Sequence, residues 1–255
     1  MQACSGLRQY LDTAATPQAD NIDAAITTSM FLGSLSFADA TEDYQVALDN
    51  RPVPFFWLSN QRGLGSLLSI FQSQSVSMQS MWLSMFDEVA EDVLRLNDNR
   101  PGIDGIPAEL AQMFGVKKTS TCDQHHYLGV LRRLCRLLRV DPGNNMALLQ
   151  YMQFVEGLSS RFVSLLNTLD IRALLLLSYW LALLCAKKCW WSQQRARNDC
   201  WAICKYLENH GDEGLWNYMD FPAAACDYPY IGVAPAGWAL INRLRRDSRQ
   251  LGLLL

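Results

Sequence analysis

The longest apolar segment of the chain runs from Ala173 to Ala186, and only Ser178 and the hydroxyl of Tyr179 interrupt it. A helix that is apolar on every side is buried on every side. The segment is shorter than the ~20 residues that a membrane span requires, and Lys187 and Lys188 follow it directly. We therefore predict a central core helix around which the rest of the chain is arranged.

Shorter segments with apolar residues at helical spacing precede and follow this run. Asp20 or Asn21 is the expected cap of the second helix, and Thr121 or Asp123 is the expected cap of the helix over 121–140. Residues 97–105 and 220–235 contain prolines and glycines and are expected to be irregular. Besides the central one, helices are expected at about residues 7–14, 22–40, 55–71, 75–96, 107–115, 121–140, 145–155, 159–169, 193–209 and from 238 onward.

The fold class follows from these patterns. Regular alternation of apolar and polar residues is missing, and β-branched residues are sparse. A chain of 255 residues, half of them hydrophobic, can bury one large core. The sequence predicts an all-α protein in which residues 1–255 form a single compact multi-helix domain.

The composition limits the cellular compartments and the binding partners that we expect. The net charge is −3 and the pI is about 5.6, which argues against direct nucleic-acid binding. The first residues, MQACSGLRQYL, lack a basic patch followed by an apolar run, so no secretory signal is predicted. We expect a cytoplasmic or nuclear protein without a membrane span or a cofactor, in which the cysteines are reduced. A homodimer is left open.

Four cysteines form two C-x3-C pairs, Cys185 with Cys189 and Cys200 with Cys204. Four thiolates can hold zinc, but structural zinc sites usually use C-x2-C knuckles on loops. These pairs lie on predicted helices rich in Trp and Leu, where cysteine packs as a small apolar residue. Core packing is therefore favoured, and no metal site is predicted.

A second group of potential ligands, Cys122, Asp123, His125 and His126, lies at a predicted helix start. The two adjacent histidines face different directions on a helix, so capping and exposure are favoured over a metal site. Histidine titrates near neutral pH, which keeps His126 as a weak candidate for a catalytic base.

Residues 87–92 (DEVAED) resemble the acidic motif with which class I terpene synthases bind magnesium. The second metal motif of those enzymes begins plausibly at Asn198 and Asp199. It then fails, because Ala202 and Tyr206 stand where a hydroxyl and a carboxylate are needed. We reject that activity and interpret the acids as a solvated helix face.

Arginines recur on one face of the predicted helix 121–140, at positions 132, 136 and 139, opposite leucines 131, 134 and 138. This pattern is typical of an ordinary amphipathic helix and is favoured over an anion site.

The chain is also rich in aromatic residues and methionine, which can line adaptable apolar pockets. For any single residue, a place in the ordinary core is the favoured interpretation. The predicted ligand-binding residues are Phe56, Trp57, Met78, Met81, Trp82, Tyr179, Trp190 and Trp191.

Four segments carry a family resemblance: Ala24–Ala38, Trp57–Leu68, Leu174–Trp191 and Leu215–Pro222. In this order they resemble the C-terminal regulatory domain of fungal binuclear-zinc-cluster transcription factors, of the sterol uptake control type. The resemblance extends over about residues 3–222. It implies an all-helical fungal protein of the nucleus or cytosol, with a sterol held in a deep apolar pocket.

The chain also departs from that family. Such regulators carry an N-terminal DNA-binding segment with six closely spaced cysteines, whereas Cys4 is the only cysteine in the first hundred residues here. Regulation of genes would then require a DNA-binding partner or an upstream exon.

Three hypotheses follow. The leading one is a stand-alone domain that binds a sterol- or terpenoid-like molecule and has a regulatory role. The alternative is a cofactor-free cyclase, a pericyclase of the Diels–Alder type in fungal terpenoid or other secondary metabolism. Such an enzyme folds its substrate into a reactive shape and needs no catalytic motif. Its candidate hydrogen-bond donors are Tyr179, Trp190, Trp191 and His126. The third hypothesis is a helical scaffold that pairs with intact regulators and inhibits them.

Overall fold

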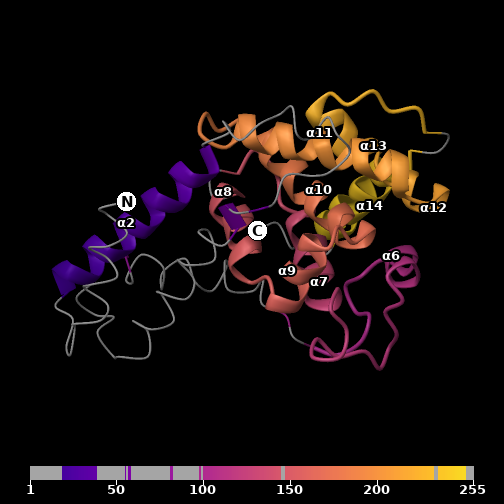
Figure 1. Cartoon of the computed structure of the whole chain (residues 1–255). Coiled ribbons are helices and arrows are strands. Elements are labelled where there is room, and N and C mark those ends of the chain that lie inside the picture. Colours follow the sequence, from indigo (N-terminus) through magenta and orange to yellow (C-terminus); the bar gives the residue numbers. More distant parts are fainter. Residues whose placement is uncertain are drawn as a thin grey trace.

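The computed structural model describes residues 19–38, 55, 57–58, 81–82, 98, 100–144, 147–232 and 235–250. Within these residues every regular element is a helix, which confirms the predicted all-α class (Figure 1). That the whole chain forms one domain stays a prediction. The helices are α2 (Ala19–Ala38), α6 (Ala108–Met113), α7 (Leu128–Leu137), α8 (Ala147–Glu156), α9 (Ser160–Asn167), α10 (Ile171–Lys187), α11 (Gln193–His210), α12 (Glu213–Trp216), α13 (Asp220–Cys226) and α14 (Ala236–Gln250).

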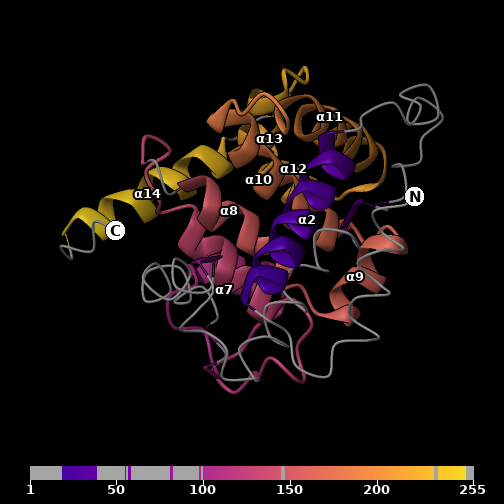
Figure 2. The same ribbon diagram turned by 90° about the vertical axis from the view of Figure 1, so that its left-hand side faces the viewer.

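Helix α10 is the predicted central helix. The Asp170 side chain caps its first turn by accepting a hydrogen bond of 2.8 Å from the Ala173 backbone N–H. Every residue from Ala173 to Cys185 is buried, and the left-handed backbone of Lys188 ends the helix. In both views α10 lies between α11 and α13 on one side and α7 on the other (Figures 1 and 2).

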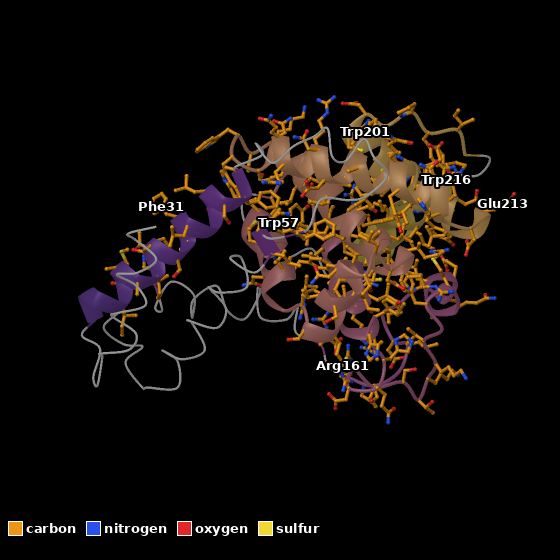
Figure 3. The ribbon with its side chains drawn as sticks, in the orientation of Figure 1. Phe31, Trp57, Arg161, Trp201, Glu213 and Trp216 are labelled. Atoms are coloured by element: carbon orange, nitrogen blue, oxygen red, sulfur yellow. The ribbon has the colours of Figure 1, made fainter. Side chains whose placement is uncertain are left out.

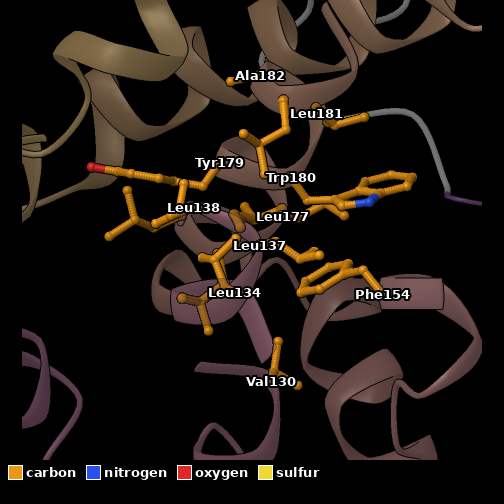
Figure 4. Close-up of a cluster of buried hydrophobic side chains, with 14 of the residues drawn as sticks. Val130, Leu134, Leu137, Leu138, Phe154, Leu177, Tyr179, Trp180, Leu181 and Ala182 are labelled. Atoms are coloured by element: carbon orange, nitrogen blue, oxygen red, sulfur yellow. The ribbon is translucent and has the colours of Figure 1, made fainter. Parts of the chain in front are cut away.

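Large apolar side chains fill the space between α10 and helices α7 and α8. Trp180 is fully buried and stacks on Phe154 of α8, with ring centroids 5.7 Å apart (Figure 4). Its indole N–H donates to the Tyr151 carbonyl at 2.6 Å, so the one polar atom of the ring has a partner. Leu134 and Leu137 of α7 pack against the same region of α10.

Helices α10, α11 and α13 pack against one another on the opposite side of α10. The prediction that residues 220–235 are irregular is therefore wrong for 220–226. Pro222 stands at the third position of α13, where a proline leaves no helical hydrogen bond unmade. The buried Asp220 carboxylate then caps α14 by accepting from the backbone N–H groups of Gly237 at 2.7 Å and Trp238 at 2.9 Å.

Two predicted helix starts are also wrong. Helix α2 begins at Ala19, so Asp20 and Asn21 lie inside its first turn and are not its caps. Helix α7 begins only at Leu128, and Thr121 and Asp123 lie in the turns before it. The helix breaks predicted near Gly157 and at Gly211 are confirmed.

Several expectations fall outside the described residues. These are the helix at 7–14, most of the predicted helices at 55–71 and 75–96, and the acidic segment at 87–92. The described fragments 57–58 and 81–82 are helical.

No helix in the described part of the chain is by itself long and apolar enough to cross a membrane. Helices α9 and α10 satisfy that test only when taken together, and the chain bends by 102° between them.

A cluster of charged side chains attaches the loop before α6 to α7. Asp98 binds Arg100 at 2.8 Å, Arg132 at 3.1 Å and Arg136 at 2.8 Å. Arg132 also donates to the Gly102 carbonyl at 2.7 Å and is buried. The amphipathic pattern of α7 therefore did not indicate that Arg132 is buried in an ion-pair cluster.

Replacement of Trp180 by alanine should strongly destabilise the folded protein. We expect Trp180→Ala to lower the free energy of unfolding by about 3–5 kcal/mol, because a buried ring is replaced by a cavity. Urea denaturation followed by circular dichroism measures the change. The matched control is Trp190→Ala, whose side chain is 87% exposed and which should change stability by less than about 0.5 kcal/mol. Equal effects of the two variants would contradict this packing.

Removal of the Asp98 charge should destabilise the protein in a pH-dependent way. Hydrogen bonds from Arg100, with the charges of Arg132 and Arg136, hold the pKa of the Asp98 carboxyl well below its usual range. A carboxyl whose pKa is lowered on folding stabilises the protein above its unfolded pKa of about 3.9 and loses that effect as the pH falls.

Asp98→Asn should therefore cost about 2–3 kcal/mol at pH 7, less than the ~3–5 kcal/mol of a fully buried pair because two of the arginines reach solvent. The difference between wild type and variant should shrink between about pH 5 and pH 2. Urea denaturation across this range measures it, with the exposed Asp123→Asn as the control. A difference that is constant with pH would show that the charge of Asp98 is not responsible.

Candidate functional site

The predicted ligand-binding residues occupy different environments. Trp57 and Tyr179 are buried, with 4% and 3% of their surface exposed, whereas Met81 is 65% exposed. Trp82 and Trp191 are partly buried. Phe56 and Met78 lie outside the described residues. The set is thus divided, and the binding role of each member stays a prediction.

Trp57 lies at the centre of a group of rings where α2 meets the body of the molecule (Figure 3). It stacks on Trp180 with centroids 5.7 Å apart, and the edge of Phe37, from the end of α2, approaches it at 4.8 Å. Trp180 therefore stacks on both Trp57 and Phe154. We call this group the aromatic junction, and it consists of Phe37, Phe55, Trp57, Phe154, Trp180 and Trp191.

A charged pair on α11 borders the aromatic junction. The Trp57 indole N–H donates to Asp199 at 3.0 Å, and Arg195 Nη1 lies 3.9 Å from the same carboxylate. Arg195 Nε donates to the Phe37 carbonyl at 3.3 Å. Both charged side chains are largely buried. The aromatic junction thus combines mostly buried, closely packed rings with a largely buried charged pair.

Tyr179 lies away from the aromatic junction. Tyr179 directly precedes Trp180 on α10, and its side chain points in the opposite direction, as Figure 4 shows. It packs against Phe221 of α13. Its hydroxyl donates to the Tyr218 carbonyl at 2.7 Å. Burial raises the pKa of this hydroxyl well above its usual value, so the proton stays on Tyr179.

Two of the remaining donor candidates are on the surface. His126 is exposed in the turns before α7, and Trp190 is exposed just beyond the end of α10. Trp191 is partly buried and belongs to the aromatic junction, where its ring lies 6.0 Å from that of Phe37. Of the donors proposed for a cyclase, Trp191 is therefore the one that belongs to the aromatic junction.

Among the described residues, one group has the geometry of metal ligands. The Sγ atoms of Cys200 and Cys204 on α11 and of Cys226 on α13 all lie within 4.8 Å of one another, and all three residues are buried. The group considered and set aside in the sequence differed, because it joined Cys200 and Cys204 with Cys185 and Cys189. Cys226 was missed, since its segment was expected to be irregular and its neighbours in space are distant in sequence.

Comparisons with protein-family models, with curated proteins and with solved structures found no match. The resemblance to fungal sterol regulators therefore stays a prediction, and the geometry of the site carries the functional argument.

Loss of the Tyr179 hydroxyl should affect stability. Tyr179→Phe removes the donor to the Tyr218 carbonyl, and we expect a loss of about 1 kcal/mol. Thermal and urea denaturation measure the change. Tyr206→Phe is the control, because that partly exposed ring stacks on His210 and should lose less than about 0.5 kcal/mol. Unchanged stability of Tyr179→Phe would mean that its hydroxyl is not needed for the fold.

Proposed function

We propose that this chain is a regulatory domain that binds a hydrophobic polycyclic molecule, of the sterol or terpenoid class, against the aromatic junction. The observation that carries this proposal is the placement of Trp57. It combines an aromatic stack on Trp180 with a hydrogen bond to the largely buried Asp199.

The stacked rings and the charged pair beside them suit such a ligand. A sterol has a flat hydrocarbon body and one hydroxyl group, so it needs a broad apolar surface and a single polar partner. The stacked rings supply apolar area with little conformational freedom to lose on binding. The pair of Asp199 and Arg195 supplies an acceptor and donors beside those rings.

The position of the aromatic junction also suits a regulatory role. The end of α2 reaches it through Phe37, whereas the first half of α2 packs elsewhere. There Asp23 accepts from the backbone N–H groups of Met81 and Trp82, and the Trp82 indole donates to Thr27 at 2.8 Å. A ligand at the aromatic junction would therefore lie where two sets of contacts meet, a common place for binding sites. Ligand binding would therefore change the contacts that hold the end of α2.

The cyclase hypothesis would use the same surface but also needs a donor to an activating carbonyl. Tyr179 faces α13, while Trp190 and His126 are exposed. Binding without chemistry is therefore favoured, and Trp191 is the residue on which a cyclase would depend.

Binding can be measured with dehydroergosterol, a fluorescent sterol, by energy transfer from tryptophan. We expect saturable binding by wild type. Trp57→Leu should weaken it at least tenfold, which corresponds to about 1.4 kcal/mol. Trp201→Leu is the matched control and should bind as wild type does, because Trp201 lies on α11 against Tyr228, away from the aromatic junction (Figure 3).

A folded wild-type protein that binds neither dehydroergosterol nor a panel of polycyclic terpenoids would contradict the proposal. Equal affinities of Trp57→Leu and Trp201→Leu would place the ligand elsewhere. Incubation with a linear polyene precursor separates the cyclase, since ring closure yields an isomer of unchanged mass.

A further inference from the structure

Three buried thiols form a cluster on the side of α10 opposite to Trp180, where α10, α11 and α13 meet. Cys200 and Cys204 are one turn apart on α11, and Cys226 is the last residue of α13. The Sγ atoms of Cys204 and Cys226 are 3.9 Å apart, and no pair within the three exceeds 4.8 Å. The left-handed backbone of Asp227 ends α13 directly after Cys226, and it stops the helix at the residue that reaches the cluster.

These distances match those between sulfurs that share one metal ion. A metal–thiolate bond is about 2.3 Å long, so three sulfurs placed evenly around one ion are about 4.0 Å apart. A disulfide, by contrast, requires sulfurs ~2.05 Å apart, and these three cysteines are free thiols. Small side-chain rotations are enough to bring the third sulfur to the distance of the first pair.

The donors around the cluster are soft. Among the residues that the structure describes, the cluster contains only sulfur, without an imidazole or a carboxylate. Backbone carbonyls also lie against it: Cys200 Sγ donates to the carbonyls of Ser178 at 3.6 Å and Pro222 at 3.5 Å, and Cys226 Sγ donates to that of Ala223 at 3.6 Å. Thiolates select copper(I) and zinc over harder ions. Structural zinc sites take four protein ligands, so a group of three sulfurs favours copper(I).

Burial raises the pKa values of Cys200 and Cys204 well above the usual value. Metal binding would therefore release protons from these thiols to the solvent.

We propose that Cys200, Cys204 and Cys226 form a three-sulfur site for a single copper(I) ion. The ion would join the end of α13 to the middle of α11. The site is separate from the aromatic junction and does not depend on the proposed function.

The ordinary alternative is that the three cysteines act as small apolar residues in a tight helix–helix contact. Cys135 provides the matched control, since it is equally buried but lies on α7 and outside the cluster. Substitution of any of these cysteines by alanine removes one sulfur and leaves the helix intact, so differences between variants report on the metal.

The test is copper(I) binding by the reduced full chain under anaerobic conditions, measured by competition with a chromogenic copper(I) chelator and by native mass spectrometry. We expect one ion per chain for wild type and for Cys135→Ala, with a rise in the melting temperature of both. Cys204→Ala and Cys226→Ala should bind at least a hundredfold more weakly, and their melting temperatures should not respond to copper. X-ray absorption of the loaded wild type should show three sulfur ligands.

The proposal is overturned if folded wild type retains no ion against the chelator, or if Cys226→Ala retains it as tightly as Cys135→Ala. Zinc bound in preference to copper, or a ligand shell containing nitrogen or oxygen, would overturn it as well. If the cluster variants fail to fold, the stoichiometry and the X-ray absorption of wild type and Cys135→Ala decide the question by themselves.

Discussion

The burial of α10 on all sides is the constraint on which the rest of the structure depends. A helix without a polar face has to be covered all round, and here α7, α8, α9, α11 and α13 contact it. Three of its polar side chains have partners: Ser178 donates to the Leu175 carbonyl of α10, Trp180 donates to the Tyr151 carbonyl of α8, and Tyr179 donates to the Tyr218 carbonyl between α12 and α13. The cover therefore forms without leaving these groups unpaired, which would be costly in an apolar interior.

Because of this arrangement, α10 contacts a different group of residues on each of two sides. On one side Trp180 takes part in the aromatic junction with Trp57. On the other side the Ser178 carbonyl contacts Cys200 in the thiol cluster. Helix α11 contributes to both, through consecutive residues: Asp199 binds the Trp57 indole, and Cys200 faces the sulfurs. An ion at the cluster would hold α11 in place and with it the carboxylate at the aromatic junction, so the two proposed sites share one rigid element.

Local sequence determined the helices and many of their ends. The apolar run predicted α10 because its residues are apolar at every helical angle, and Gly157 and Gly211 marked real breaks because glycine weakens a helix. Pattern reasoning failed where a local rule met a tertiary contact. Pro222 suggested irregular chain, yet α13 forms there against α10 and α11. Arg132 was placed on the polar side of an amphipathic helix, yet it is buried and pairs with the Asp98 carboxylate.

The composition of both candidate sites was decided only in the tertiary structure. Periodicity places a residue on a face of its own helix, but it does not say which distant segment meets that face. Trp57 and Asp199 are 142 residues apart in sequence. Cys204 and Cys226 are 22 residues apart and lie on different helices. Trp57 was identified from the sequence by its chemistry, whereas Asp199 and Cys226 became partners only because α10 draws α11 and α13 against itself. The sequence by itself thus determined that α10 is buried, and the packing of its neighbours decided which side chains meet around it.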